Sequence, residues 1–408
     1  PSSHGTAAPR PFWRIELAEM ARLGAPIVFT QLAWVAMLTT DTAMIGRMGP
    51  DALAGASLSL MIFFLTWVFC FGVIMATAAL ASQAFGARKP RMIRRVIRQG
   101  FWATIVLTVP AMIAFRYTPD LLGLLSQPPE ILPHADAYMS TLMWCLIPSI
   151  GFAVVRNFIS SLNRPTPALW VMLAGVPLNG LLDYALIFGN FGLPRLELVG
   201  AGIATSIVNW LMFFVLLAIA VFAKPFRRYS ILGRFWRPDW CQFRQIFRIG
   251  LPIAAMSLLE AGFFFSAIFI VGQFGAHAIA ATMIALQMPH ITFMVPMGLG
   301  QAATVRVGQA VGRRDTEGAY RSGWVAVSIA LVFMSVMTAI VLSLPETFAS
   351  IYLDGAHPDS AAVLALAASY LIYAAFFPAA DGIQAVAAGA LRGLSDTTWP
   401  LVIAALRD

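Results

Sequence analysis

The chain has 408 residues, of which 59% are hydrophobic and only 11% are charged. A soluble domain carries about a quarter charged residues, whereas apolar stretches of about 20 residues, long enough to cross a bilayer, recur along this sequence. The composition therefore predicts an all-α polytopic membrane protein. The net charge of +8 does not indicate a nucleic-acid partner, because the basic residues lie in the connections between the apolar stretches.

The first 23 residues are expected to form a polar tail and a short interfacial helix. In this region "FWRIELAEMARL" places Trp13, Leu17 and Met20 on one helical face. The apolar runs that follow predict ten complete transmembrane helices and the start of another. They lie at residues 24–46, 52–84, 99–115, 137–160, 168–189, 200–223, 250–273, 278–306, 323–345 and 361–390, and from 398 onward.

Lys and Arg concentrate in the even-numbered connections between these spans. The segments "ARKPRMIRRVIR", "KPFRRYSILGRFWRPDWCQFRQIFR" and "GRRDTEGAYR" follow spans two, six and eight, whereas the odd-numbered loops carry few basic residues and several acids. By the positive-inside rule, this asymmetry predicts that the even-numbered loops and the N-terminus face the cytoplasm.

The sequence repeats itself at a spacing of 226 residues. "RLGAPI" at 22–27 falls on "RIGLPI" at 248–253, and "QAFGAR" at 83–88 falls on "QAVGRR" at 309–314. Because six spans precede the second copy, both copies start on the same side of the membrane, which predicts a parallel repeat about an axis along the membrane normal.

The repeat divides the chain into an N-lobe of six helices (24–223), a basic cytoplasmic linker (224–247) and a C-lobe (248–408). Matched to the first copy, the second is expected to extend about one and a half spans beyond residue 408. Four to five of its helices are then expected here, and the second six-helix bundle is expected to be truncated at its C-terminus.

Four acidic residues fall inside predicted spans, and each shares its span with a proline. A charged residue at a helix centre costs about 2.5–3.5 kcal/mol to insert, and a proline frees backbone carbonyls that a membrane tolerates only inside protein or beside water. The combination predicts cation or proton sites in a wet cleft. For Asp41, a carboxylate that merely reaches headgroup water remains an alternative. The pairs are Asp41 with Pro26, Asp183 with Pro177, Glu260 with Pro252, and Asp381 with Pro378.

Asn179 precedes Asp183 by four residues, so the two side chains share a helix face. A carboxylate and an amide oxygen are hard ligands suited to Na⁺, or a protonatable group with a hydrogen-bond partner. A simple hydrogen bond between helices is the alternative. Asp41 and Asp183 both lie toward the outer ends of spans that run in the same direction, so we expect them to converge.

The sequence lacks the motifs of several other functional classes. There is no "GxxxxGK[ST]" nucleotide loop, no "HExxH", and no clustered acids to hold Mg²⁺ and a diphosphate. The scattered acids favour ion coupling over a catalytic centre. We therefore predict a protein that is not an enzyme and needs no cofactor beyond a coupling ion.

Several segments together resemble the multidrug and toxic compound extrusion (MATE) transporters. They are "DTAMIGRMG" at 41–49, "RNFISSLNRP" at 156–165, "FMVPMGLGQAATVRVGQAVG" at 293–312 and "DGIQAVAAGALRG" at 381–393. The presence of both Glu260 and Asp381 resembles the NorM branch. The resemblance implies two six-helix lobes around a V-shaped central cavity, and efflux of lipophilic organic cations in exchange for Na⁺ or H⁺. It further implies a bacterial-type cytoplasmic (inner) membrane.

The family pattern also implies roles for individual residues. In the N-lobe it implies a cation or proton site at Asp41, Asn179 and Asp183, with Thr205, Ala201, Tyr138 and Asn157 as further members. In the C-lobe it implies a second cation or substrate site at Glu260 and Asp381. Ion binding at the N-lobe site is expected to bend or straighten the first span about Pro26.

Two other functions fit a large helical membrane protein. A lipid-linked precursor flippase would need cationic cavity residues for a diphosphate, yet the intramembrane charges here are mostly acidic. A membrane-embedded transferase would need clustered Mg²⁺-binding acids. The repeat within one chain also predicts a self-sufficient monomer.

Overall fold

The computed structural model describes residues 12–124, 128–192, 194–272, 276–343, 370 and 377–397, and the regular structure in these residues is helical. The long helices are α1 (Phe12–Gly46), α2 (Pro50–Gly86), α3 (Pro90–Phe115), α7 (Thr166–Phe188), α8 (Glu197–Phe222), α9 (Trp240–Gly272), α10 (Ala276–Arg313), α11 (Thr316–Ser343) and α14 (Phe377–Gly393). The shorter elements are α4 (Thr118–Leu124), α5 (Leu132–Leu142), the 3₁₀ turn η1 (Met143–Cys145), α6 (Leu146–Ser161) and the 3₁₀ turn η2 (Phe226–Tyr229).

Eight of the described helical segments are long and apolar enough to cross a membrane. Their outer faces carry large exposed apolar side chains, among them Trp170, Phe214 and Val332, as expected of a surface that meets lipid. The prediction of an all-α polytopic membrane protein is confirmed. Residues 361–369 and 371–376 of the predicted tenth span, and the span predicted from 398, lie outside the described residues.

Several helices extend beyond the predicted spans. α3 begins at Pro90 rather than near residue 99, and α9 begins at Trp240 rather than near residue 250. The predicted interfacial helix and the first span form one continuous helix, α1. Hydropathy detects only the part of a helix that lies in hydrocarbon, whereas the hydrogen-bonded backbone continues into basic segments that are good helix formers.

The fourth predicted span, 137–160, is interrupted in the structure. A 3₁₀ turn at Met143–Cys145 separates α5 from α6. Pro148 lies just beyond it and has no N–H to donate to the carbonyl of Trp144, so the regular α-helical bonding cannot pass through this point. The chain therefore tightens into a 3₁₀ turn.

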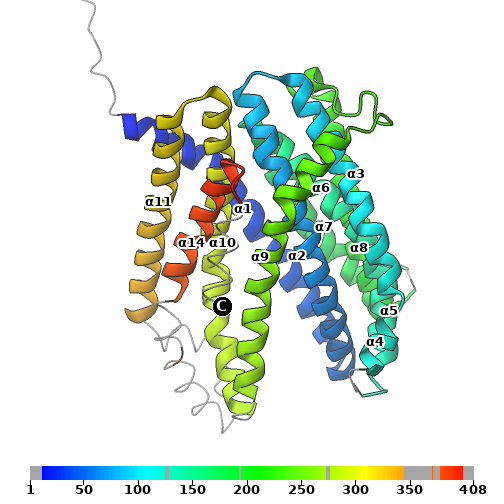
Figure 1. The fold of residues 1–408 in the computed structure, drawn as a ribbon. Coiled ribbons are helices and arrows are strands. Elements are labelled where there is room, and N and C mark those ends of the chain that lie inside the picture. The colour runs from blue at the N-terminus through cyan, green and yellow to red at the C-terminus, as the bar shows by residue number, and fades with distance from the viewer. Residues whose placement is uncertain are drawn as a thin grey trace, which may run out of the picture.

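The described helices form two groups, and two long helices cross between them (Figure 1). α2, α3 and α5 to α8 pack together around one large apolar core, whereas α10, α11 and α14 pack on one another. α1 starts against α10 and α11, where Met20, Leu23 and Ile27 are buried, and ends against α7. α9 does the reverse, because its first part packs on α2 and α3.

The 226-residue repeat divides the chain into a first half (24–223) and a second half (248–408), and the contacts between these two halves follow the same spacing. At seven described glycines the halves approach so closely that an added Cβ atom would lie within 3.1 Å of the other half. Six of these contacts form three pairs, in which both partners of one contact are displaced by 226 residues in the other. The pairs are Gly24 on Leu299 with Gly250 on Val73, Gly72 on Ala254 with Gly298 on Val28, and Gly86 on Gln309 with Gly312 on Gln83. In the seventh contact, Gly308 meets Ser82, and these two residues are themselves 226 positions apart.

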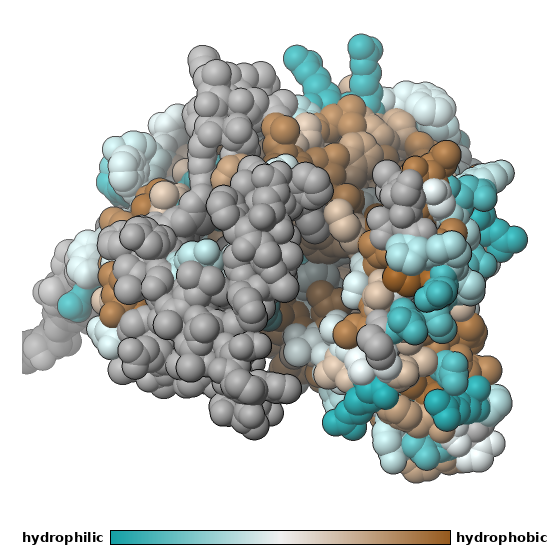
Figure 2. Space-filling model, turned by 90° about the horizontal axis from the view of Figure 1, so that it is seen from below, coloured by the Kyte–Doolittle hydropathy of each residue, from teal (hydrophilic) through white to brown (hydrophobic). Residues whose placement is uncertain are grey.

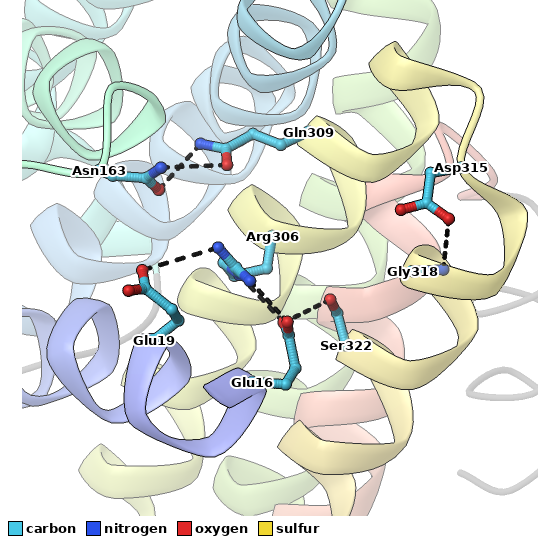
Figure 3. A network of polar contacts seen from close by, with 8 residues as sticks. All are labelled: Glu16, Glu19, Asn163, Arg306, Gln309, Asp315, Gly318 and Ser322. Atoms are coloured by element: carbon cyan, nitrogen blue, oxygen red, sulfur yellow. Dashed lines mark hydrogen bonds and ion pairs between the residues drawn. The ribbon is translucent and has the colours of Figure 1, made fainter. Parts of the chain in front are cut away.

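Two glutamines related by this repeat, Gln83 and Gln309, also join the halves by hydrogen bonds. The Nε2 atom of each donates to a backbone carbonyl at the end of a helix in the other half, and to the side chain two residues further on. Figure 3 shows the contact between Gln309 and Asn163. The partners are Gly393 (2.9 Å) and Ser395 (2.8 Å) for Gln83, and Ser161 (2.9 Å) and Asn163 (2.9 Å) for Gln309. We call these four hydrogen bonds the glutamine clasp.

A buried ion pair holds the start of α1 to the second group of helices (Figure 3). Arg306 donates from Nη2 to Oε2 of Glu16 at 2.6 Å and from Nε to Oε1 at 3.1 Å. Ser322 donates to the same Oε1 at 2.6 Å. A two-pronged Arg–carboxylate contact is geometrically specific, so it fixes the first turns of α1 on α10 and α11.

The two ends of the molecule differ. The glutamine clasp and the Glu16–Arg306 pair lie at the end where α1 begins, which is the upper end in Figure 1. The surface of the opposite end is hollowed toward the centre of the molecule (Figure 2). The halves are therefore joined at the end that carries the basic α2–α3, α8–α9 and α10–α11 connections.

Candidate functional site

Three long helices bring polar side chains together inside the first group. α1 supplies Asp41, α7 supplies Asn179 and Asp183, and α8 supplies Thr205. These side chains are between 0% and 7% exposed. On α7 the four-residue spacing places the amide directly beside the carboxylate, as expected for one helix face. The convergence of Asp41 with Asp183 agrees with the sequence-based expectation.

Hydrogen bonds connect these side chains into one cluster. The Nδ2 group of Asn179 donates to Oδ1 of Asp41 and, at 2.8 Å, to Oδ2 of Asp183. The hydroxyl of Thr205 lies 3.2 Å from Oδ2 of Asp41 and 3.1 Å from the carbonyl of Ala201. A hydroxyl has one proton, so it donates to one of these two acceptors at a time. We call Asp41, Asn179, Asp183 and Thr205 the Asp41 cluster.

The Asp41 cluster contains more acceptors than donors. Oδ1 of Asn179 and Oδ1 of Asp183 are buried and have no hydrogen-bond partner among the described residues. Neither Asp41 nor Asp183 forms an ion pair with a described Lys or Arg. Two neighbouring buried carboxylates cannot both stay charged without compensation. The arrangement is therefore suited to take up a proton or to hold a hard cation such as Na⁺ by its oxygens.

Two further N-lobe candidates, Tyr138 and Asn157, occupy different places. Tyr138 on α5 is buried and packs with Ile45 and Ala201 in the apolar cluster that adjoins the Asp41 cluster. Asn157 on α6 donates to Oγ1 of Thr77 at 3.0 Å and to the carbonyl of Ile74 at 3.3 Å. The hydrogen bonds of Asn157 thus tie α6 to α2, and its side chain is not part of the Asp41 cluster.

The two acids of the second half lie on different helices. Glu260 is on α9 and Asp381 is in the first turns of α14, and both are half-buried. Gln384, one turn after Asp381, donates from Nε2 to Oε1 of Glu260 at 3.4 Å. Because Asp381 and Gln384 share a helix face, this contact brings the region of Glu260 toward that of Asp381.

Pro26 lies inside α1, fifteen residues before Asp41. It cannot donate to the carbonyl of Arg22, so one helical hydrogen bond is missing there. Thr30 uses its hydroxyl to bond the carbonyl of Pro26 at 2.7 Å. α1 nevertheless continues through Pro26, so the helix is weakened at this residue but not interrupted.

Arg156, a basic residue within the predicted span 137–160, was not among the functional residues predicted from the sequence. The side chain of Arg156 is 5% exposed and donates from Nη1 to Oε1 of Gln31 at 3.3 Å. Its guanidinium also lies over the ring of Phe71. Nε and Nη2 have no partner among the described residues. The signal that could have revealed Arg156 was the presence of a basic residue well inside a predicted transmembrane span.

Comparisons with a family model and with known proteins agree with one another. A family model described as MatE matches residues 26–185 and 252–407. A protein of Mesorhizobium japonicum described as "Probable multidrug resistance protein NorM" is 41% identical over 404 residues, which cover 98% of this chain and 86% of that protein. A protein of Rhodopseudomonas palustris with the same description is 45% identical over 394 residues, which cover 97% of this chain and 83% of that protein.

A solved structure shares the fold at lower sequence identity. It is described as "Outward-facing conformation of a multidrug resistance MATE family transporter of the MOP superfamily". The likeness has a TM-score of 0.85 with 20% identity, and covers 96% of this chain and 86% of that one.

Proposed function

Because this chain belongs to the multidrug and toxic compound extrusion (MATE) family of multidrug efflux transporters, we propose that it exports lipophilic organic cations in exchange for Na⁺ or H⁺. Members of this family are transporters and not enzymes, in agreement with the sequence-based prediction. The NorM descriptions of relatives at about 40% identity likewise agree with the predicted branch.

The observation that carries the proposal is the surplus of buried acceptors in the Asp41 cluster. Asp41 and Asp183 share the amide of Asn179, and an oxygen of Asp183 and one of Asn179 have no partner in the described part of the chain. A proton or Na⁺ would neutralise this surplus, and its release would restore it. Such a site can exchange one cation for another, which is the chemistry that an antiporter needs.

Glu260 and Asp381 provide a second acidic site in the proposed scheme. They lie on α9 and α14 of the second half, whereas the Asp41 cluster lies on α1, α7 and α8 of the first. We assign to them the binding of a second coupling ion or of the cationic substrate. Competition between ion and substrate for carboxylates makes the exchange obligatory, because only one of them can neutralise a given site at a time.

The transport cycle proposed here is alternating access between two lobes, 24–223 and 248–408, joined by the basic linker 224–247. The paired contacts at 226-residue spacing support a parallel repeat, and the hollow opposite the glutamine clasp supports a V-shaped cavity. With basic loops in the cytoplasm, the arrangement corresponds to an outward-open state whose cytoplasmic side is closed. Both lobes belong to one chain, so we expect a monomer to suffice.

The coupling ion can be identified with the complete protein in energised inverted membrane vesicles. Ethidium efflux is expected to require either a Na⁺ gradient or a pH gradient imposed across the vesicle. An imposed gradient of the coupling ion alone should drive ethidium movement, whereas the other gradient should not. Ethidium movement that neither gradient drives, or that ATP drives without them, would contradict the antiport proposal.

Replacing Pro26 with alanine is expected to reduce coupled efflux several-fold while ethidium binding is retained. Alanine restores the missing hydrogen bond to Arg22 and stiffens α1, so cation uptake at the Asp41 cluster can no longer bend the helix. Efflux rate and equilibrium ethidium binding measured on the same preparation separate these effects. Unchanged coupled transport would show that α1 does not bend about Pro26.

A further inference from the structure

A second polar feature lies far from both acidic sites, where α3 begins. Arg91, Arg94 and Arg95 in the first turns of α3 and Arg234 in the α8–α9 connection line a pocket of about 560 Å³. Asp239 is the acid that pairs with this group, through Arg95 at 3.7 Å. Four guanidinium groups around one space with a single carboxylate beside them leave an excess of positive charge there.

The pocket is held in place by a rigid base. Arg98, one turn below, is 6% exposed and donates from Nη1 to the carbonyl of Arg234 at 2.9 Å. Trp102 stacks on Phe235 and donates to its carbonyl at 3.2 Å. These contacts fix the α8–α9 connection against α3. The Nε atom of Arg98 is buried and has no partner among the described residues.

The surroundings of the pocket are those of a membrane interface. Directly below it, the outer face of α3 exposes Trp102, Val106 and Val109, which are 36%, 49% and 41% exposed. Two further tryptophans of the same region, Trp236 and Trp240, are 77% and 72% exposed. Exposed Trp side chains mark the headgroup level of a bilayer, and an exposed aliphatic helix face below them marks its acyl region.

From this juxtaposition we propose that Arg91, Arg94, Arg95 and Arg234 bind the phosphate headgroup of an anionic phospholipid of the cytoplasmic leaflet. The guanidinium groups provide charge-assisted hydrogen bonds to phosphate oxygens. The acyl chains lie along the exposed face of α3. A soluble anion would contact only the arginine pocket. A phospholipid contacts the pocket with its headgroup and the exposed face of α3 with its acyl chains, so a lipid is the occupant that fits. This inference does not depend on the transport function.

The test uses the complete protein, delipidated in detergent, with binding followed by native mass spectrometry. Phosphatidylglycerol is the probe, and phosphatidylcholine and inorganic phosphate are the comparison ligands. We expect retention of phosphatidylglycerol over phosphatidylcholine, and no displacement by inorganic phosphate at equal concentration. In the double variant Arg91→Gln/Arg94→Gln, the affinity for phosphatidylglycerol should fall about thirtyfold.

The matched control is Arg313→Gln/Arg314→Gln, which removes two exposed arginines, the last residue of α10 and the residue after it, at the same end of the molecule. It should leave phosphatidylglycerol binding unchanged, because it alters the net charge equally but not the pocket. An equal loss in both variants would overturn the proposal, as would equal binding of phosphatidylcholine. Full competition by inorganic phosphate would show a free-anion site and would overturn it too. Thermal unfolding of each variant verifies that it is folded.

Discussion

Asp41→Asn is expected to abolish coupled ethidium efflux in a protein that still folds. The substitution keeps the size of the side chain but removes the charge that Asn179 and Thr205 contact in the Asp41 cluster. A neutral amide can neither release a proton nor bind Na⁺ strongly. We therefore expect efflux to fall to the level of vesicles without the transporter. This is a loss of at least about tenfold relative to the wild type, because losing a buried charge interaction costs several kcal/mol.

The measurement compares wild type and Asp41→Asn in energised vesicles with and without the coupling gradient. Asp51→Asn is the matched control. Asp51 is an exposed acid in the first turn of α2, so this substitution makes the same chemical change outside the Asp41 cluster. Wild-type efflux in Asp51→Asn with loss in Asp41→Asn would make Asp41 part of the coupling machinery. Unimpaired coupled efflux in Asp41→Asn would refute that role and leave Glu260 and Asp381 as the acids to pursue.

The second large effect is expected at the pair of glycines beside the glutamine clasp. A Cβ atom added at Gly86 would collide with the backbone carbonyl of Gln309, and one added at Gly312 with that of Gln83. Alanine is the better helix former, so a loss in Gly86→Ala or Gly312→Ala must come from the contact between the halves. Overpacking costs about 1–3 kcal/mol, which would lower the population of the proposed state with a closed cytoplasmic side about five- to 150-fold.

We expect both variants to lose most of their coupled efflux, and to a similar extent, because the two contacts are related by the repeat. Closure can be read separately by labelling Ser161→Cys, introduced with Cys241→Ser, with an impermeant thiol reagent from the side of the glutamine clasp, because Ser161 is fully buried and a cysteine there keeps the backbone carbonyl that Gln309 contacts. Labelling should be faster in both glycine variants. Gly323→Ala is the control, since an added Cβ there meets Ala390 at an ordinary 3.6 Å. Normal efflux with unchanged labelling in Gly86→Ala would show that this contact does not close the cytoplasmic side.

The contacts that join the two halves at the glutamine clasp are symmetric, whereas the two acidic sites are not. Gln83 and Gln309 bond the other half in the same way, with partners separated by two residues in both cases. The Asp41 cluster instead uses α1, α7 and α8, whereas Glu260 and Asp381 lie on α9 and α14. The repeat therefore supplies paired contacts between the halves, and the two halves differ in the acidic side chains that their helices carry away from that end.

The sequence by itself determined the features that depend on local spacing and composition. The apolar runs indicated an all-α membrane protein because hydrocarbon admits long apolar helices. The four-residue spacing of Asn179 and Asp183 predicted their contact, since a helix places such residues on one face. The 226-residue repeat was likewise readable from short matching segments, because it needs no knowledge of packing.

Tertiary structure alone decided which helices meet. Asp41 lies 138 residues from Asn179 along the chain, and only the packing of α1 on α7 turns the expected convergence into hydrogen bonds. The same packing sends Asn157 to Thr77 rather than to the Asp41 cluster. It also lets Gln83 and Gln309 reach across to the opposite half. Helical periodicity says which side chains share a face, but the partner of that face depends on close contacts, such as those at Gly86 and Gly312, between residues far apart in sequence.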